Sequence, residues 1–247
     1  MFYSLRKKLL HLKHKRTNHY SVFRWRDLVL LLDTKDYISR KILIGGGFEP
    51  DLVDAIERSI SLRKPALFID VGSNLGLYSC IAARAGVAEI HSFEPNPRLL
   101  AFQRANFAMN EFRNIEVHAC GLSDFDADDQ DFLISPRSNS GLSRFGNRPA
   151  DDDDWHVGRI PVRRLDGLFT HSGQVVMVKV DVEGAERRFL AGAKAFLTNN
   201  RCDLFIEIID GRAEVSPILA AMGYAQQREF AANNFWFTNY EVLPHPY

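Results

Sequence analysis

The stretch that most constrains the fold is "LFIDVGSNLGLYS", residues 67–79. An apolar run ends around Asp70, and a turn with two glycines leads directly into a second apolar segment that is rich in small residues. Continuous apolar runs of this kind are typical of parallel strands that are covered on both faces. We therefore expect a strand, a tight turn and a helix in succession, a unit that holds negatively charged or nucleotide-like ligands.

The chain after Pro65 repeats this alternation of strand-like and helix-like segments. Such repetition predicts an α/β fold with a doubly wound, mostly parallel sheet, to which a C-terminal hairpin adds an antiparallel edge. Between the third and fourth strands the helical signal disappears, and short strands around a polar loop are expected instead. The expected parallel strands lie within residues 66–72, 89–95, 115–124, 175–181 and 202–208, the irregular region is 125–166, and the hairpin pairs 225–230 with 233–239.

Residues 1–64 are predicted to form a basic arm and a helical N-terminal extension, followed by one domain over residues 65–247. Eight arginines and lysines precede the first acidic residue, within residues 1–26. This arm is expected to be solvated or to contact an anionic membrane surface or substrate. Its apolar runs are too short for a secretory signal or a membrane span. Residues 20–62 are expected to be helical, since Leu52, Ile56 and Ile60 recur at helical spacing.

The composition excludes some classes of partner. Lysine plus arginine equals aspartate plus glutamate at 31 each, so no overall field would attract nucleic acid, and no nucleic-acid partner is expected. The three cysteines are scattered within apolar stretches, which fits buried reduced thiols in a cytoplasmic protein better than a disulfide framework. The sequence leaves the oligomeric state open.

The residues of the first turn indicate which ligand it holds. A dinucleotide site would carry the spacing G-x-G-x-x-G, but Asn74 stands where the second glycine would lie, close to a pyrophosphate. Gly72 and Gly76 still allow a ligand to approach the backbone, and Asp70 suits a ligand with a positively charged amine. S-adenosylmethionine meets this description, because its carboxylate can accept turn amides while its ammonium is attracted to Asp70.

Acidic and polar residues follow the other strands, at the edge of the sheet where ligands of such folds bind. Glu94 is expected to accept hydrogen bonds from the two ribose hydroxyls, and Ser123 and Asp124 are placed to meet the adenine ring. The predicted cofactor-binding set is Asp70, Gly72, Ser73, Asn74, Gly76, Glu94, Ser123, Asp124 and Asp181.

Six segments resemble, in order, the successive blocks of the FkbM family of S-adenosylmethionine-dependent methyltransferases. The resemblance runs from Phe68 to Glu207 and implies a Rossmann-like class I methyltransferase domain over residues 65–247. It also implies methyl transfer to oxygen, often on a sugar hydroxyl or a polyketide-type natural product, so that the partner is a small-molecule or glycan acceptor. The segments are "FIDVGSNLGLYS", "FEPNP", "CGLSD", "NSGLS", "VRRLD" and "VKVDVEGAE".

The catalytic candidates follow the fourth and fifth strands. Methyl transfer is an in-line displacement, and an alcohol acceptor must also lose a proton to a nearby base. We expect Asp181 to lie closest to the methyl donor, with Glu183 and Glu207 as candidate bases and Lys179 as a cation that neutralises them. Asp181 and Glu207 could share a divalent metal, but no third ligand is evident, so no metal is assigned.

Several other features have simpler interpretations. Residues 139–144, "NSGLSR", are expected to form an acceptor-binding loop, and residues 151–154, "DDDD", a solvated loop. His91 and His118 lie within predicted strands, where structural roles are expected. Two alternative functions stay open from the residues: a nicotinamide-dependent oxidoreductase, which Asn74 argues against, and a non-catalytic cofactor-binding module that the basic arm recruits to a partner.

Overall fold

The structure is a computed structural model that describes residues 19–146, 154–209 and 211–240. The predictions for the basic arm before residue 19 and for Asp151, Asp152 and Asp153 therefore lie outside the described residues. Among the described residues, no helix has both the length and the apolar character needed to cross a membrane.

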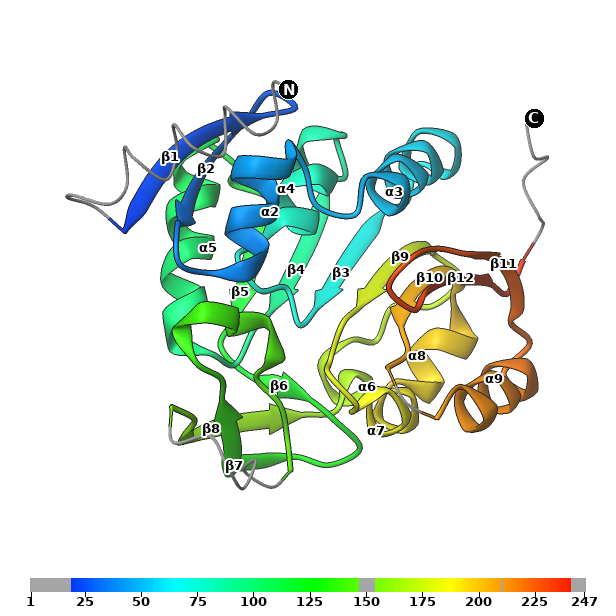
Figure 1. The fold of residues 1–247 in the computed structure, drawn as a ribbon. Helices are drawn as coiled ribbons and strands as arrows, with labels where there is room; N and C mark the ends of the chain where they lie inside the picture. The colour runs from blue at the N-terminus through cyan, green and yellow to red at the C-terminus, as the bar shows by residue number, and fades with distance from the viewer. Residues whose placement is uncertain (1–18, 147–153, 210, 241–247) are drawn as a thin grey trace.

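A seven-stranded sheet forms the centre of the molecule, in the order β11-β12-β10-β9-β3-β4-β5 (Figure 1). The five strands from β10 to β5 run parallel, and β12 and β11 extend the sheet as an antiparallel hairpin. This order confirms the predicted doubly wound, mostly parallel α/β fold with an antiparallel C-terminal edge. The strands are β3 (Leu67–Val71), β4 (Glu89–Phe93), β5 (Ile115–His118), β9 (Val175–Val180), β10 (Arg201–Glu207), β11 (Ala225–Glu229) and β12 (Asn234–Thr238).

Helices cover both faces of this sheet, and the alternation of side chains along the strands explains why (Figure 1). In β9, Val176, Val178 and Val180 join one apolar core, whereas Met177 joins the core on the opposite face. Both faces of the strand are apolar because successive side chains point to opposite faces and each face is buried. The helices are α2 (Tyr37–Gly45), α3 (Pro50–Arg63), α4 (Leu77–Arg84) and α5 (Pro97–Met109) on one face, and α6 (Leu165–Leu168), α7 (Glu186–Gly192), α8 (Lys194–Asn199) and α9 (Arg212–Ala221) on the other.

The N-terminal extension is only partly helical, so the prediction of helix throughout residues 20–62 is wrong for its first part. Strands β1 (Tyr20–Trp25) and β2 (Leu28–Asp33) form an antiparallel hairpin, and α2 and α3 follow it as helices. Leu28, Leu30 and Leu32 are buried with period two in the same core as α4 and α5. The free edge of β2 is paired by side chains of α5, which no local pattern could indicate.

Asparagine side chains of α5 satisfy that edge. Asn106 Oδ1 accepts a hydrogen bond from the Leu31 amide at 2.7 Å. Asn110 accepts from the Val29 amide at 2.8 Å and donates to the Val29 carbonyl at 2.7 Å. Because buried backbone groups need partners, these contacts stabilise the segment as a strand in spite of its helix-compatible composition.

A second, three-stranded sheet lies beside the carboxyl ends of the central strands (Figure 1). It consists of β6 (Gly121–Leu122), β8 (His156–Arg163) and β7 (Ala127–Ile134). The 3-10 segment η1 (Arg137–Leu142) follows β7 and packs against α2. The predicted short strands within residues 125–166 are thereby confirmed.

At Gly72 the backbone of the turn after β3 lies directly against the backbone at the end of β9. Its φ angle is +73°, and a Cβ atom at this position would lie 1.7 Å from the carbonyl oxygen of Asp181. The Asp181 amide in turn donates to the Val71 carbonyl at 2.9 Å. No residue with a side chain fits between these two backbones.

We expect Gly72→Ala to lower the free energy of unfolding by roughly 2–4 kcal/mol, because the substitution adds a steric clash to the cost of a left-handed backbone. The matched control is Gly86→Ala, where φ is +87° but no atom lies within 4 Å of the added Cβ. This control should lose only about 1–2 kcal/mol. Urea denaturation of both variants measures the difference, and equal losses would contradict the proposed clash.

Candidate active site

A cavity of about 510 Å³ opens at the carboxyl ends of β3, β4, β9 and β10. Its place matches the point where the strand order reverses, since β4 and β5 lie on one side of β3 and β9 lies on the other. The volume is in the range of small-molecule and cofactor sites. Its apolar walls include Phe93, Leu99, Leu122, Phe132, Leu142 and Phe145.

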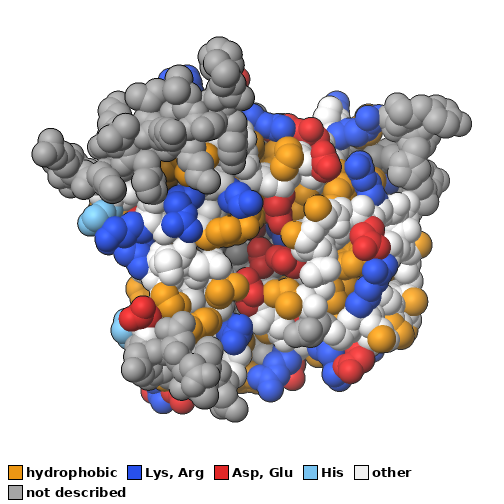
Figure 2. Space-filling model, viewed as in Figure 1, with side chains coloured by type: hydrophobic (Ala, Val, Ile, Leu, Met, Phe, Trp, Pro, Cys, Tyr) orange, Lys and Arg blue, Asp and Glu red, His pale blue; other side chains and the backbone are white. Residues whose placement is uncertain are grey.

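The floor of this cavity is acidic. Figure 2 shows acidic side chains gathered in the hollow at the centre of the face. Lys41 is the only lysine or arginine that the described residues contribute to the lining. A cavity with this excess of carboxylates favours a positively charged ligand. The acidic lining residues are Glu49, Glu94, Asp181, Glu183 and Glu207.

Glu94 connects the ends of β3 and β4. One carboxylate oxygen accepts from the Asn74 amide at 2.9 Å, and the other accepts from the Asn96 amide at 2.8 Å. Burial raises the pKa of Glu94 to about 8, although both amides act in the opposite direction. The protonated form that this pKa favours at neutral pH can donate one hydrogen bond to a ligand and accept another, and the ionised form can accept at both oxygens.

Asp181, Glu183 and Glu207 lie together in the cavity, as the sequence predicts. Burial, followed by the charge of Asp181, raises the pKa of Glu207 to about 9, and Glu207 shares a hydrogen bond with Asp181. Glu207 therefore holds a proton at neutral pH. Burial and the charge of Asp181 also raise the pKa of Glu183, but only to about 7. Glu183 and Glu207 therefore lose their protons in different pH ranges within one site.

Lys179 lies beneath this group instead of lining the main cavity. Its side chain is buried, and Nζ donates to the Val180 carbonyl at 3.2 Å and to Asn234 Oδ1 at 3.1 Å. It lines a small adjoining pocket together with Asp70 and Asp181. The charge of Lys179 lowers the pKa of Asp70, Glu183 and Glu207, which fits the predicted neutralising role.

Only part of the predicted cofactor set reaches the main cavity, where Gly72, Asn74, Glu94 and Asp181 line it. Asp70 and Ser73 reach only the adjoining pocket, and Gly76 lines neither. The Asp70 carboxylate accepts from the amide and hydroxyl of Ser79 at 2.9 and 2.6 Å, so it caps α4. Burial raises the pKa of Asp70 to about 6.

The prediction that Ser123 and Asp124 meet the adenine ring is not supported by their position. Neither lines the cavity. Gly192 of α7 packs against the Ser123 backbone, where an added Cβ would lie 1.8 Å from the Ser123 carbonyl oxygen. The segment that does face the cavity is residues 120–122, immediately before this pair. The strand ends before the polar pair, and the chain turns away under α7.

Glu49 was not predicted and is central to the site. It is the N-cap of α3, with φ of +44°, and its carboxylate accepts hydrogen bonds from Tyr78 Oη and from Asn234 Nδ2, the latter at 3.0 Å. Pro50 at the start of α3 marks the helix, but no pattern in the sequence shows that this helix begins over the carboxyl ends of a distant sheet.

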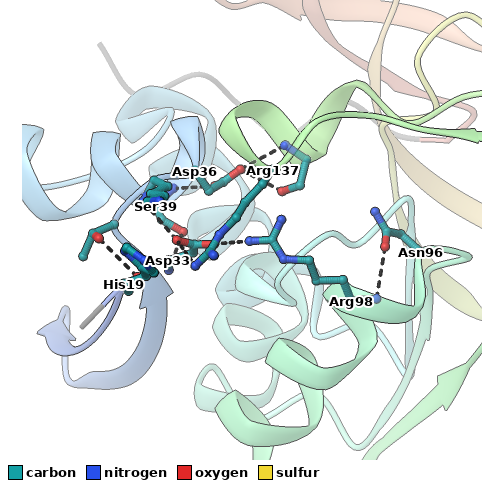
Figure 3. A network of polar contacts seen from close by, with 10 residues as sticks. His19, Asp33, Asp36, Ser39, Asn96, Arg98 and Arg137 are labelled. Carbon is teal, nitrogen blue, oxygen red and sulfur yellow. Dashed lines mark hydrogen bonds and ion pairs between the residues drawn. The ribbon is translucent and has the colours of Figure 1, made fainter. Parts of the chain in front are cut away.

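Segment η1, which contains most of the predicted acceptor loop, forms one wall of the cavity and is held by polar contacts to two buried aspartates, Asp33 and Asp36 (Figure 3). Asp33 at the end of β2 forms ion pairs with Arg98 of α5 and with Arg137 of η1, whose Nε lies 2.8 Å from Asp33. Asp36 caps α2 by accepting from the Ser39 amide, and it also accepts from the Ser140 amide and hydroxyl at 3.0 and 2.7 Å. The N-terminal extension therefore positions this wall.

The raised pKa of Glu207 makes stability depend on pH. Between its ordinary value of 4.5 and about 9, the folded state binds more protons than the unfolded state, so the free energy of unfolding falls as pH rises. We expect Glu207→Gln to reduce this fall between pH 5 and pH 9, with a higher melting temperature than the parent at pH 9. Thermal unfolding across this range tests it. The exposed control Glu111→Gln should leave the slope unchanged, and an unchanged slope in Glu207→Gln would contradict the assignment.

The fold and the cavity together define a class: an open α/β domain with an acidic cavity at the reversal point of a parallel sheet, the place where such folds bind nucleotide-like ligands. Residues 70–230 match the family described as Methyltransferase FkbM domain. The chain belongs to this methyltransferase family, and its cofactor is S-adenosylmethionine. An acidic floor and apolar walls fit a cofactor that carries a sulfonium and an ammonium group beside an aromatic base.

Individual relatives are distant. Methyltransferase 1 of Beauveria bassiana is 25% identical over 184 residues, which cover 65% of this chain and 72% of that protein. The 31-O-demethyl-FK506 methyltransferase FkbM of Streptomyces tacrolimicus is 28% identical over 168 residues. That match covers 56% of this chain and 64% of the Streptomyces protein, slightly less than two thirds of it. A solved structure, precorrin-6y C5,15-methyltransferase of Geobacter metallireducens, is 14% identical with a TM-score of 0.45, over 76% of this chain and 86% of that one.

Proposed function

We propose that the protein transfers a methyl group from S-adenosylmethionine to a hydroxyl oxygen of a small-molecule or glycan acceptor. The observation that carries this proposal is that Asp181, Glu183 and Glu207 line one cavity at the carboxyl ends of β9 and β10, where burial raises the pKa of Glu183 to about 7. A carboxyl group with this pKa is ionised in part at neutral pH, and it can accept the hydroxyl proton as the bond from oxygen to the methyl carbon forms and the hydroxyl becomes acidic.

The three carboxyl groups then have distinct roles in the proposed reaction. The cofactor, when bound, supplies an electrophilic methyl group. Asp181 orients the acceptor hydroxyl or the cofactor amine, and its charge is stabilised by the proton of Glu207. Glu183 accepts the hydroxyl proton as the bond from oxygen to the methyl carbon forms and the bond from sulfur to that carbon breaks. Lys179 limits the total negative charge without contacting the main cavity.

The acceptor is proposed to bind between α2 and η1. Tyr37, Ile38 and Lys41 line the cavity from α2, and residues 139–143 line it from η1 and the residue after it. Aromatic and apolar surfaces beside hydroxyl and amide groups suit a hydroxylated ligand of mixed polarity. The name of the Streptomyces relative describes a methyltransferase for a hydroxyl of FK506, which is consistent with oxygen as the acceptor atom.

Cofactor binding can be tested without knowing the acceptor. We expect Glu94→Gln to weaken the binding of S-adenosylhomocysteine at least tenfold, because one carboxylate oxygen that can accept ligand hydroxyls becomes an amide donor. Isothermal titration calorimetry measures the Kd, with Glu111→Gln as the control. NADH should show no binding in the same assay. An unchanged Kd in a Glu94→Gln protein of normal melting temperature would remove Glu94 from the cofactor site.

Turnover tests the roles of the carboxyl groups. With a labelled methyl donor and a panel of hydroxylated glycans and metabolites, Glu183→Gln should lower kcat about 100-fold or more, the usual contribution of a general base. Asp181→Asn should lower turnover more than it weakens S-adenosylhomocysteine binding. In the parent protein the rate should rise with pH through about 7, since Glu183 must be ionised.

The pH profile separates catalysis from structural effects. Glu183→Gln should lose the rise around pH 7 while its Kd for S-adenosylhomocysteine stays within about threefold of the parent value. A rate that still rises through pH 7 in Glu183→Gln would exclude Glu183 as the base. Cofactor binding with no turnover on any acceptor would favour the non-catalytic alternative.

A further inference from the structure

Two histidines and a glutamate lie side by side on one face of the sheet, outside the cofactor cavity. Strands β4 and β5 are parallel, and their register pairs His91 with Glu116 and Phe93 with His118. Side chains two residues apart point to the same face of a strand. The register therefore places His91, Glu116 and His118 together at the edge of the sheet, and none of them lines the cavity.

The distances within this cluster are those of a metal-binding set. His91 Nδ1 lies 2.9 Å from His118 Nε2. Glu116 oxygens lie 3.6 Å from His91 Nδ1 and 3.8 Å from His118 Nε2. Ligand atoms about 2.0–2.1 Å from a tetrahedral zinc ion are separated from one another by roughly 3.3–3.4 Å. The 3.6 Å distance involves Glu116 Oε2 and the 3.8 Å distance Oε1, and one ligand atom from each residue lies within 4.8 Å of the others. A rotation of the exposed Glu116 side chain that turns one oxygen toward both nitrogens would therefore admit an ion.

A hydrogen bond between the two imidazoles explains only part of this geometry. It accounts for the 2.9 Å contact, but it leaves Glu116 beyond hydrogen-bond distance of both rings. A cation at the centre of the triangle gives all three groups a common partner.

Neighbouring groups fix the rings in the orientation that metal binding needs. The Glu89 carboxylate lies 2.9 Å from His91 Nε2, so a proton held there leaves the lone pair of Nδ1 directed at the cluster. Phe93 stacks on His118 with ring centroids 4.3 Å apart, and Phe169 meets His91 edge-on at 4.7 Å. The two histidine side chains are 9% and 21% exposed and Glu116 is 66% exposed, which leaves one open side.

We propose that His91, Glu116 and His118 form a binding site for a divalent transition metal of the zinc type, with solvent as the fourth ligand. Imidazole nitrogens and one carboxylate are the donor set that such ions prefer over calcium or magnesium. The site joins the edge strand β5 to β4 and replaces the purely structural role that the sequence predicts for these histidines. It does not depend on the proposed methyl transfer.

Cobalt titration tests this site directly. The full chain without a histidine tag, freed of metal by a chelator, should bind one equivalent of Co²⁺ with the intense visible absorption of a tetrahedral ion, and Zn²⁺ should abolish the absorption. Zn²⁺ should also raise the melting temperature. His118→Gln and Glu116→Gln should each weaken Co²⁺ binding at least tenfold. The control is His156→Gln, an exposed histidine of β8 outside the cluster, which should bind as the parent does.

The opposite results are equally clear. Absence of a stoichiometric cobalt spectrum in the parent protein would overturn the proposal, as would Co²⁺ affinity that is equal in the parent and in Glu116→Gln. If His118→Gln fails to fold, Glu116→Gln still decides, because its side chain is largely exposed and its replacement leaves the imidazole pair intact. Affinity should fall as pH is lowered through the range where imidazoles protonate, since protons compete for the same lone pairs.

Discussion

The contact between the turn after β3 and the end of β9 is the constraint on which the candidate active site depends. Strand order reverses between these two strands, so the chain leaves β3 and β9 toward opposite faces of the sheet and a cavity opens between the two connections. The two strands stay paired to their ends, where Gly72 passes the Asp181 carbonyl. This crossing places Asn74 and Asp181 on the same cavity floor. A side chain at Gly72 would separate the two strands at the position where the carboxylates need fixed mutual distances. Close backbone packing and fixed distances between the cavity carboxylates therefore both require glycine at position 72.

Burying several carboxyl groups in one cavity lowers the free energy of unfolding, and three arrangements reduce this cost. Backbone amides hold Glu94, the buried Lys179 opposes the charge from below, and Glu207 keeps its proton. Each arrangement lowers the cost of burying carboxyl groups without removing them. A positively charged cofactor adds a fourth source of compensation, which the protein alone does not contain. Protein stability and the binding of a positively charged ligand are therefore linked. The carboxyl groups whose ionisation lowers the free energy of unfolding at high pH are the same groups whose negative charge attracts that ligand.

The sequence predicts the elements of the central sheet better than the positions of side chains at their ends. Continuous apolar runs identify β3 and β9, and the carboxylates after them follow directly from the fold class. The β1–β2 hairpin could not be predicted, because apolar residues occupy both faces of β2 and its edge partners, Asn106 and Asn110, come from a distant helix. Ser123 and Asp124 do not line the cavity, because a difference of a few residues in where a strand ends decides which side chains face it. Glu49 depends on tertiary structure alone.

Phe93 is the residue through which the edge of the sheet and the cofactor turn are connected. Its carbonyl accepts from the amides of Gly72 and Ser73, both at 3.0 Å, and from the Ser73 hydroxyl at 3.1 Å. Its ring lines the cavity on one side and stacks on His118 on the other. Protein interiors are close-packed, so a small displacement of one side chain is transmitted to its neighbours. A ligand that orders His118 therefore also restrains the Phe93 ring, and the Phe93 backbone holds the turn after β3 through the Gly72 and Ser73 hydrogen bonds.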